Sequence, residues 1–519
     1  MPSKEKSFAL EIIDAIRCGK IKTPRELTFW KRKMSKKYGV LGIVPNSEIL
    51  KYADKRKGLE VLIKKPVRTI SGVCIVAVMA KPHPCPGKCI YCPEGDDSPK
   101  SYTGLEPAAR RAKMFNYDPY LQAKNRLEQL HAIGHPIEKA ELIIMGGTFP
   151  AQDTEYQKEF VKRCLDAMNQ TESKTLEGAQ KLNETTKTRC VGLTIETRPD
   201  FCKKEHINAM LALGTTRVEI GVQTLSDTIY KKMERGHSIK DVIEATQLLK
   251  DSGIKVCYHM MPGLLQDEKE DLKMFRELFN NPDFRPDMLK IYPTLVTEGT
   301  GIYKLWKEGK YTPYDNERAA KLVAEIKKIL PPYVRLMRVQ RDIPKEKIAA
   351  GVTAGNLREL AEKILLKEGS KCRCIRCREA GHMRYKKGVV PEKVEITELE
   401  YKSSEGTEYF ISAEDIEKDV LVGYLRLRIP AKPFRPEIDA KTALVRELKV
   451  SGTSTPLGEK GDAFQHKGLG KKLMERAEKI AGERAMKKIV VTSAIGTREY
   501  YRKFGYERTG VYVGKSVNK

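Results

Sequence analysis

The sequence predicts an α/β protein whose largest part is a parallel sheet, curved or closed into a barrel, followed by a smaller α/β domain. Two patterns support this fold class. Short apolar runs alternate with amphipathic stretches from residue 71, and a second set of apolar runs begins near residue 391. The 519 residues are too many for one hydrophobic core. We therefore expect four segments: 1–70, 71–345, 346–390 and 391–519.

The first segment, residues 1–70, is expected to be mostly helical and basic. Residues 1–68 hold 18 Lys and Arg against 7 Asp and Glu, and the whole chain has a net charge of +27. A solvated helix surface would also be basic, but two basic runs close to Trp30 and Tyr38 favour a nucleic acid, because phosphates attract cations and aromatic rings stack on bases. The candidate RNA-binding residues are Lys31, Arg32, Lys33, Lys36, Lys37, Lys55, Arg56 and Lys57.

Six apolar runs separated by helical stretches form the expected sheet. They are residues 73–80, 140–149, 189–197, 216–223, 255–263 and 288–295. Ligands of parallel sheets bind at the carboxyl ends of the strands, so polar residues at those ends are site candidates. Two other stretches are expected outside the sheet: 170–187 as an exposed polar insertion, and the basic stretch 334–348 as a linker or RNA surface.

The loop after the first strand reads CPGKCIYC, with Cys85, Cys89 and Cys92 at spacings of four and three. Zinc is one possible ligand, with His83 as a fourth donor, because closed zinc sites need four ligands. A [4Fe–4S] cluster held by three thiolates is the other, and it leaves one iron open. This spacing resembles the radical S-adenosylmethionine (SAM) enzymes. The resemblance implies a partial (β/α)6 barrel in which SAM binds the open iron and yields a 5′-deoxyadenosyl radical.

Polar residues end the later strands of the predicted barrel. In MGGTFP the glycines let backbone groups approach a ligand closely, and the same resemblance implies that this motif binds the methionine amino group of SAM. His259 and Lys290 lie within the fifth and sixth strands, near Tyr292, and are the candidate catalytic residues of the barrel. The candidate SAM-binding residues are Gly146, Gly147, Thr148, Glu196, Arg198 and Gln223.

A second cysteine cluster, KCRCIRCREAGH, contains Cys372, Cys374 and Cys377. Its interleaved basic residues favour thiolates, so we expect a zinc-binding linker. His382 is the nearest candidate for a fourth ligand, and a residue from elsewhere could serve. A second iron–sulfur cluster is the alternative.

The C-terminal segment contains QHKGLGKKLMERAEKIA, in which glycines precede an amphipathic helix between two predicted strands. Backbone N–H groups at such a helix start can hold a pyrophosphate. The arrangement resembles the GNAT acetyltransferases, which implies acetyl-CoA and a tyrosine at the CoA thiolate. Tyr500 and Tyr501 are the candidates, and the sequence does not choose between them. The implied acetyl-CoA-binding residues are Glu447, Leu448, Lys449, Val450, Gln465, His466, Lys467, Gly468, Leu469, Gly470 and Lys471.

The combination of these parts resembles the catalytic subunit of Elongator over nearly the whole chain. Matching stretches include SYTGLEPAARRA, LIIMGGTFP, GLTIETRPD and AFQHKGLGKKLMERAE. The shorter cysteine loop and the three-cysteine linker are similar to the bacterial or archaeal branch, which acts without the other Elongator subunits. The resemblance implies carboxymethylation of tRNA uridine 34 at C5. The adenosyl radical takes hydrogen from the acetyl methyl group, and thioester hydrolysis follows addition to the base. The implied partners are the anticodon stem-loop and an electron donor.

Two other classes of function remain open on the sequence. The C-terminal domain could acetylate lysines of histones or other proteins, with the barrel in a structural role, or the chain could be a tRNA-binding module that senses acetyl-CoA. Neither explains the three-cysteine loop together with the basic N-terminal segment. The sequence lacks a signal-peptide pattern and a run long enough to span a membrane, so a cytoplasmic location is expected.

Overall fold

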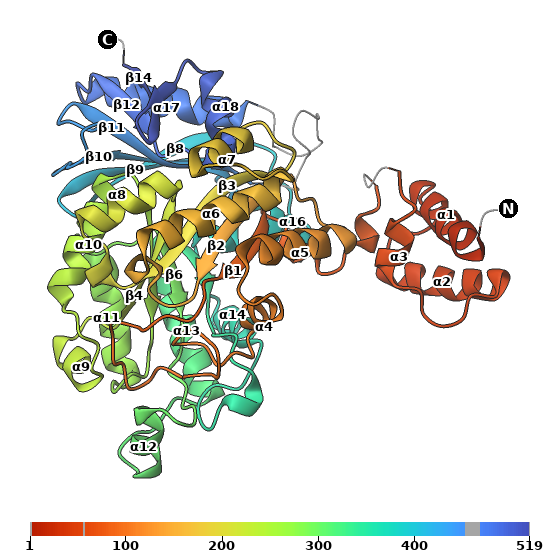
Figure 1. The fold of residues 1–519 in the computed structure, drawn as a ribbon, viewed down its shortest axis with the longest axis horizontal. Helices are drawn as coiled ribbons and strands as arrows, with labels where there is room; N and C mark the ends of the chain where they lie inside the picture. Colours follow the sequence, from red (N-terminus) through yellow and green to blue (C-terminus); the bar gives the residue numbers. More distant parts are fainter. Residues whose placement is uncertain (1–2, 55–57, 452–467, 518–519) are drawn as a thin grey trace.

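The computed structural model describes residues 3–54, 58–451 and 468–517, and its centre is a sheet of parallel strands in chain order (Figure 1). The sheet ends at β1 on one edge and β7 on the other, so the barrel is partial. All six predicted strands are present. The strands are β1 (Cys74–Met79), β2 (Lys139–Met145), β3 (Arg189–Thr197), β4 (Arg217–Gln223), β5 (Lys255–Met260), β6 (Met288–Ile291) and β7 (Arg335–Arg338).

The seventh strand corrects the prediction that 334–348 is a linker or RNA surface. Residues 335–338 pair in parallel with β6. Arg335 is buried, and its Nη2 lies 2.8 Å from the carboxylate of Glu379. The strand is short and carries two arginines, so its apolar pattern is weak. Its charge is neutralised by a partner 44 residues further along the chain.

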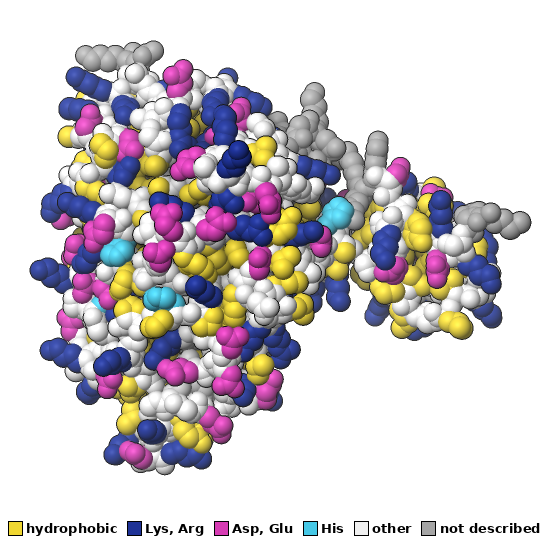
Figure 2. All heavy atoms as spheres, in the orientation of Figure 1, with side chains coloured by type: hydrophobic (Ala, Val, Ile, Leu, Met, Phe, Trp, Pro, Cys, Tyr) yellow, Lys and Arg dark blue, Asp and Glu magenta, His cyan; other side chains and the backbone are white. Residues whose placement is uncertain are grey.

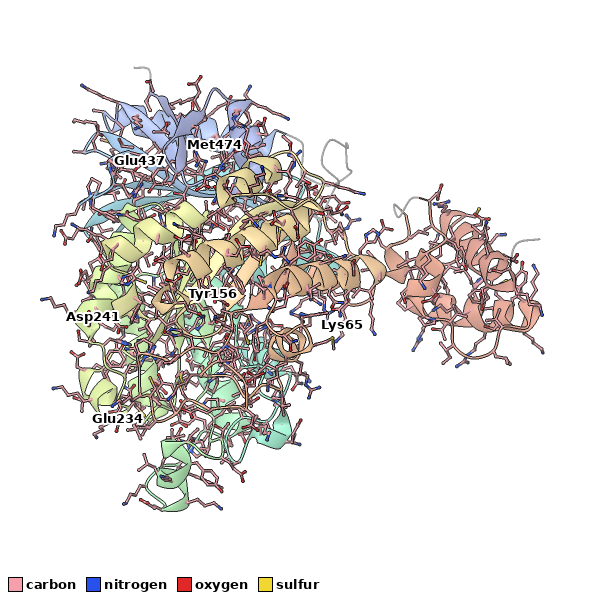
Figure 3. All side chains as sticks on the ribbon, in the orientation of Figure 1. Lys65, Tyr156, Glu234, Asp241, Glu437 and Met474 are labelled. Atoms are coloured by element: carbon pink, nitrogen blue, oxygen red, sulfur yellow. The ribbon has the colours of Figure 1, made fainter. Side chains whose placement is uncertain are left out.

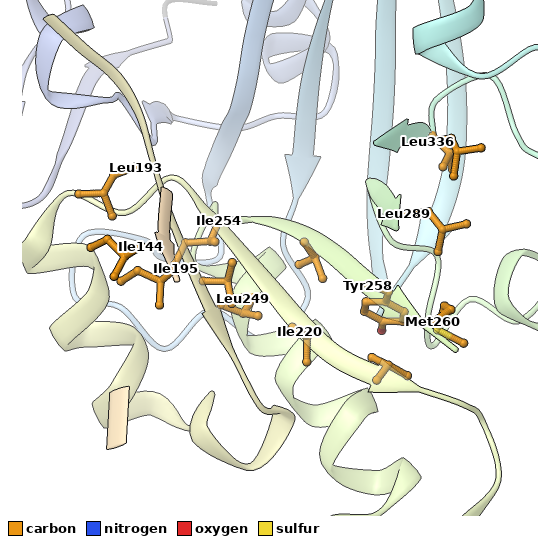
Figure 4. Close-up of a cluster of buried hydrophobic side chains, with 14 of the residues drawn as sticks. Ile144, Leu193, Ile195, Ile220, Leu249, Ile254, Tyr258, Met260, Leu289 and Leu336 are labelled. Atoms are coloured by element: carbon orange, nitrogen blue, oxygen red, sulfur yellow. The ribbon is translucent and has the colours of Figure 1, made fainter. Parts of the chain in front are cut away.

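The strands of the barrel alternate between an apolar outer face and a polar inner face. In β4, Val218 and Ile220 belong to the main hydrophobic core, whereas Arg217 and Glu219 face the interior. Figure 4 shows part of this core, with Ile144, Leu193, Ile195, Ile220, Leu289 and Leu336 from β2, β3, β4, β6 and β7. The helices that cover this face include α5 (Pro119–Ala132), α6 (Thr154–Asn169), α8 (Lys204–Leu213), α10 (Ile239–Asp251), α11 (Glu268–Asn280) and α13 (Asn316–Ile329).

The polar stretch 170–187 is exposed over much of its length, as predicted, but part of it is buried against the rest of the fold. It contains α7 (Leu176–Asn183), whose polar side chains are used internally. Asn183 donates to Asn169 Oδ1 at 2.8 Å and accepts from the backbone N–H of Cys190 at 2.7 Å. Glu184 is 3% exposed and pairs with Arg498 and Arg502 of the C-terminal domain. The segment therefore joins the barrel to that domain.

The N-terminal helices lie to one side of the barrel and have a hydrophobic core of their own (Figure 1). They are α1 (Lys4–Arg17), α2 (Pro24–Tyr38) and α3 (Asn46–Leu50). Thr23 and Glu26 form a reciprocal capping box at the start of α2, and Gly39 ends it with a left-handed backbone. Figure 2 shows Lys and Arg side chains on the surface of both these helices and the main body.

The C-terminal domain is a second sheet with the strand order β13-β14-β12-β11-β10-β9-β8. β8, β9 and β10 are antiparallel neighbours and, as predicted, α17 (Leu469–Glu483) follows the glycine-rich segment. Figure 3 shows this domain, with Glu437 and Met474, beside the barrel helices that carry Tyr156 and Asp241. The strands are β8 (Glu395–Ser403), β9 (Gly406–Asp415), β10 (Val420–Ile429), β11 (Thr442–Val450), β12 (Lys488–Val491), β13 (Glu507–Thr509) and β14 (Tyr512–Ser516).

The two sheets are joined by fully buried ion pairs. Asp287, just before β6, is 2.6 Å from Arg446 Nη2 on β11. Arg428 on β10 is 2.6 Å from Asp251 at the end of α10. These pairs fix the C-terminal domain against the barrel. Among the described helices, none has the length and apolar character that a membrane span requires.

Candidate active sites at the two ends of the barrel

The cysteine loop lies over a cavity at the carboxyl ends of the barrel strands. Cys85, Cys89 and Cys92 line this cavity together with residues from β2 to β7. Arg235 Nη1 lies 3.2 Å from the sulfur of Cys89. A hydrogen bond with Cys92, together with Arg235, lowers the pKa of Cys89 to about 4. At least one thiolate is therefore favoured at this loop, which suits binding of an iron–sulfur cluster.

The glycine motif at the end of β2 faces the same cavity. Gly146 has φ 118°, and a Cβ there would lie 3.2 Å from the backbone nitrogen of Ala80 on the neighbouring strand end. Gly147, with φ 84°, and the buried Thr148 both line the cavity. Gly146 is therefore needed for close packing against Ala80, whereas Gly147 leaves its backbone open to the cavity. The SAM-binding role of both glycines stays a prediction.

Glu196, Arg198 and Gln223 also meet in this cavity. Glu196 accepts a hydrogen bond from the hydroxyl of Tyr102 at 2.8 Å. Arg198 pairs with Asp200, while its buried Nη1 has no hydrogen-bond partner among the described residues. Gln223 has φ 75°, which is rare outside glycine, and its buried Oε1 is likewise unpaired within the described chain. Strained backbone and unpaired polar atoms at one place are typical of a ligand site.

His259 and Lys290 are held by a carboxylate that the sequence reasoning missed, Glu219 on β4. His259 Nε2 shares a hydrogen bond with Glu219 at 2.8 Å, and Lys290 forms an ion pair with the same side chain. Burial opposes the charge of Lys290, but Glu219, Tyr292 and Glu196 together outweigh burial and raise the pKa of the lysine. Lys290 is therefore a fixed cation. The catalytic roles predicted for both residues stay predictions.

The other missed residues of this cavity are Tyr102, Arg235, Arg338 and Arg341. They come from loops and from the unpredicted β7. The one usable signal was in β4, where TRVEIGVQ places Arg217 and Glu219 inside an otherwise apolar run. A charged side chain is rarely buried in a strand without a partner, so this pattern indicates a polar barrel interior.

A second cavity of about 730 Å³ lies between the C-terminal domain and the amino ends of the barrel strands. On β11, only residues 442–445 pair with β12. The rest of β11, residues 447–450, has β10 on one side and lines the cavity. The side chain of Glu447 is already paired with Arg426 at 2.9 Å. Residues 447–450 therefore form one wall of the cavity beside β10.

The start of α17 opens onto the same cavity. Gly468 is its N-cap, with φ 77° and no side-chain cap, and residues 468–471 line the cavity. Uncapped N–H groups at a helix start suit a pyrophosphate. Gln465, His466 and Lys467, which were predicted to join this site, lie outside the described residues.

The two tyrosines differ in environment. Tyr501 is 6% exposed and belongs to the core of the C-terminal domain. Tyr500 is 38% exposed, and its hydroxyl occupies the space that a side chain at Gly470 would need. Tyr500 thus reaches the helix start directly, so we favour it for contact with a CoA thiol.

The second cysteine cluster lies on a helical linker formed by α14 (Leu357–Lys367), α15 (Ile375–Arg378) and α16 (Ala380–Lys387). The sulfurs of Cys372, Cys374 and Cys377 all lie within 4.8 Å of one another. His382 is not within this distance of the three sulfurs; its Nε2 lies 3.9 Å from Glu379 and has no hydrogen-bond partner among the described residues. Hydrogen bonds from the other two cysteines hold the pKa of Cys374 well below its usual value. The trio fits three ligands of a metal ion.

The basic residues of α2 fall into two groups. Arg32, Lys33 and Lys36 are exposed on one face of the helix, beside Phe29, which is 64% exposed. Lys31 is instead held inward, donating to the carbonyl of Val44 at 2.7 Å. Lys37 pairs with Glu11 at 2.7 Å. Lys55, Arg56 and Lys57 lie outside the described residues.

Four regions of the chain match known protein families. Residues 6–70 match the ELP3 N-terminal domain, and residues 83–279 match the radical SAM superfamily. Residues 286–367 match the radical SAM C-terminal domain, and residues 461–515 match the GNAT acetyltransferase domain.

The chain is also similar to curated proteins over most of its length. It is 57% identical over 490 residues to a tRNA uridine(34) acetyltransferase of Methanocaldococcus jannaschii, covering 92% of this chain and 91% of that protein. It is 46% identical over 468 residues to Elongator complex protein 3 of Homo sapiens, covering 87% and 86%. A structure of Methanocaldococcus infernus Elp3 with an N-terminal deletion superposes with a TM-score of 0.78 at 53% identity. That match covers 86% of this chain and 100% of the other.

Proposed function

Because this chain belongs to the Elongator complex protein 3 family, we propose that it carboxymethylates tRNA uridine 34 at C5 with acetyl-CoA as carbon donor. The observation that carries the proposal is the pair of cavities on one barrel. Three cysteines and a glycine motif line the cavity at the carboxyl ends of the strands, and a CoA-type helix start lines the cavity at the amino ends. A lysine acetyltransferase needs only the second cavity.

The residues present fit the two groups that the radical SAM family implies. Cys85, Cys89 and Cys92 would hold a [4Fe–4S] cluster, and the glycine backbone at Gly146 and Gly147 would face SAM. When bound together, these groups supply a 5′-deoxyadenosyl radical. The chain's own contribution is the enclosed polar cavity, which separates reactive groups from water and positions them. We also propose zinc for Cys372, Cys374 and Cys377, with a fourth ligand still to be assigned.

The experiment is an anaerobic reaction of cluster-reconstituted protein with SAM, a reductant, tRNA and acetyl-CoA labelled with carbon-13 in the acetyl group. We expect 5-carboxymethyluridine carrying both labelled carbons, measured by mass spectrometry of digested nucleosides, and none when SAM is omitted. Acetyl-lysine formed on added histone peptides at equal rates with and without SAM and tRNA, with no modified uridine, would instead establish the acetyltransferase function.

The exposed basic face of α2 is proposed to bind the tRNA. Replacing Arg32, Lys33 and Lys36 with alanine is expected to weaken tRNA binding and to make the slope of log affinity against log salt shallower. Each lost phosphate contact changes that slope by roughly 0.7 to 0.9. Filter binding or fluorescence anisotropy at several salt concentrations measures both quantities. Lys31 is left intact because it holds the loop at Val44.

The matched control for this variant removes the same charge from another exposed helix face. Lys269, Lys273 and Arg276 are exposed on α11, which lies on the barrel away from the N-terminal helices (Figure 1). Alanine at these three positions is expected to leave the slope unchanged. Equal losses from both triple variants would mean that the protein's net charge, rather than α2, attracts tRNA.

We further propose that the chain acts without the other Elongator subunits. It is 51% identical to a bacterial tRNA uridine(34) acetyltransferase of Dehalococcoides mccartyi, covering 88% of this chain and 100% of that protein. The reaction still requires an electron donor, whose docking site is not assigned.

A further inference from the structure

The two cavities are separated by one layer of side chains inside the barrel. We call the cavity at the amino ends of the strands, beside α17, the CoA-side cavity, and the cavity under the cysteine loop the cysteine-side cavity. Arg217 lines the CoA-side cavity, and Glu219 lines the cysteine-side cavity. They are two residues apart on β4, which corresponds to about 7 Å along a strand. A methyl group that starts on CoA must cross this layer to reach the cysteine-side cavity.

The layer is a continuous line of ion pairs. Arg217 Nη2 lies 2.5 Å from Glu141 on β2 and 3.3 Å from Glu219. Glu219 pairs with Lys290, and Lys290 lies 3.5 Å from Glu196 on the wall of the far cavity. Barrel interiors are usually filled by layers of apolar side chains. Buried ion pairs contribute little net stability, so a stabilising role does not explain why this line of charges is present. Contact with a polar species that passes between the cavities explains it better.

The CoA side of the layer presents cations with unused hydrogen-bonding capacity. Arg217 is 4% exposed and Arg335 is 6% exposed. Arg217 Nε and Arg335 Nη1 have no hydrogen-bond partner within the described part of the chain. Lys255 lines the same cavity, and burial lowers its pKa. Two buried guanidinium groups with open N–H positions suit a small carboxylate.

We propose that the acetyl unit crosses this layer as free acetate, with its carboxylate held by Arg217. This inference rests on the proposed function and changes the order of its steps, because thioester hydrolysis comes first. One water adds to the acyl carbon, a C–O bond forms and the C–S bond breaks. CoA leaves as the thiol with one proton, and acetate leaves with release of the other. The methyl group then reaches the cysteine-side cavity without CoA.

Charge distinguishes acetate from the intact thioester. A neutral thioester would break the pairs of Arg217 with Glu141 and Glu219 without replacing them, leaving buried charges uncompensated. An acetate anion brings a carboxylate that keeps Arg217 hydrogen-bonded while it moves between the cavities. The free carboxylate is also already present in the carboxymethyl product.

The first test supplies the reconstituted protein with SAM, reductant, tRNA, free CoA and doubly carbon-13-labelled acetate at millimolar concentration, without acetyl-CoA. A parallel reaction contains unlabelled acetyl-CoA in place of the labelled acetate. We expect carboxymethyluridine two mass units heavier in the first reaction and unlabelled product in the second. Product from acetyl-CoA alone, with none from acetate, would overturn this inference and keep the proposed function. Absence of product from both reactions would overturn both.

The second test measures acetate binding and does not need the cluster. Carbon-13 line broadening of labelled acetate is recorded with purified protein and CoA, for the wild type, Arg217→Met and Arg217→Lys. We expect Arg217→Met to lose most of the broadening and Arg217→Lys to retain part of it. Arg484→Met, which removes an exposed cation paired with Glu400, is the control and should match the wild type.

The same variants separate hydrolysis from modification. Arg217→Met is expected to lose at least tenfold in carboxymethyluridine, a larger loss than its loss of tRNA-dependent CoA thiol release. Retained thiol release also shows that this variant folds. Equal acetate broadening in all four proteins, or equal modification by wild type and Arg217→Met, would refute the role of Arg217.

Discussion

Replacing Cys85, Cys89 and Cys92 together with serine is expected to abolish carboxymethyluridine formation completely and to remove the bound iron. The three thiols line one cavity, and a hydroxyl is a poor ligand for iron–sulfur clusters. The loop carries no regular helix or strand, so the melting temperature of the protein without its cluster should stay close to that of the wild type. Iron content, nucleoside mass spectrometry and thermal denaturation measure the three quantities.

The matched control replaces the other cysteine trio, Cys372, Cys374 and Cys377, with serine. Cys372 and Cys374 lie between α14 and α15, and Cys377 lies in α15. The backbone N–H of Ile375 donates to the carbonyl of Val334 beside β7. We expect this variant to lose zinc, to keep the iron of the reconstituted cluster and to melt at a lower temperature. If both triple variants lost iron equally, the second cluster would also be an iron site, and the zinc proposal would be wrong.

The sequence was sufficient to predict the strands in which apolar residues recur at every second position. Residues 189–197 and 255–260 could be recognised in this way, because Leu193 and Ile195, and likewise Val256 and Tyr258, belong to the main hydrophobic core. β7 could not be recognised in this way, since its arginines depend on Glu379 for neutralisation. For the same reason α7 was misjudged: its polar residues are satisfied by partners in β3 and α18 that only the fold brings close.

The candidate site was predictable where strand ends define it. Parallel strands place their carboxyl ends at one edge, so Gly147, Glu196 and Gln223 meet in one cavity although the chain separates them. The partnerships inside the barrel were not predictable. Glu219 binds Lys290 across two strand crossovers, and no local pattern records such a pairing. The difference between Tyr500 and Tyr501 also depends on packing alone.

Replacing Asp287 with asparagine is expected to cause the largest loss of stability of any single change considered. Asp287 is fully buried and accepts from Arg446 at 2.6 and 2.8 Å and from the backbone N–H of Val256 at 2.9 Å. Removing the charge of Asp287 leaves the buried guanidinium groups of Arg446 and Arg426 without one of their carboxylate partners. Breaking a buried pair in this way costs about 3–5 kcal/mol. Urea denaturation of the two proteins at neutral pH measures the difference.

The pH dependence of this loss of stability shows whether the missing charge of Asp287 causes it. Burial opposes the charged form of Asp287, but Arg446, Lys250 and Arg426 together outweigh burial and hold the pKa of this carboxyl below its usual value. A carboxyl group with a depressed pKa stabilises the fold above the unfolded value of about 3.9, and this contribution is lost as the pH falls below it. The difference in free energy of unfolding between wild type and Asp287→Asn should therefore become smaller under acidic conditions. Glu400→Gln, which breaks an exposed pair with Arg484, should cost no more than about 1 kcal/mol. A difference that stayed constant down to acid pH would mean that lost packing, rather than lost charge, destabilises the variant.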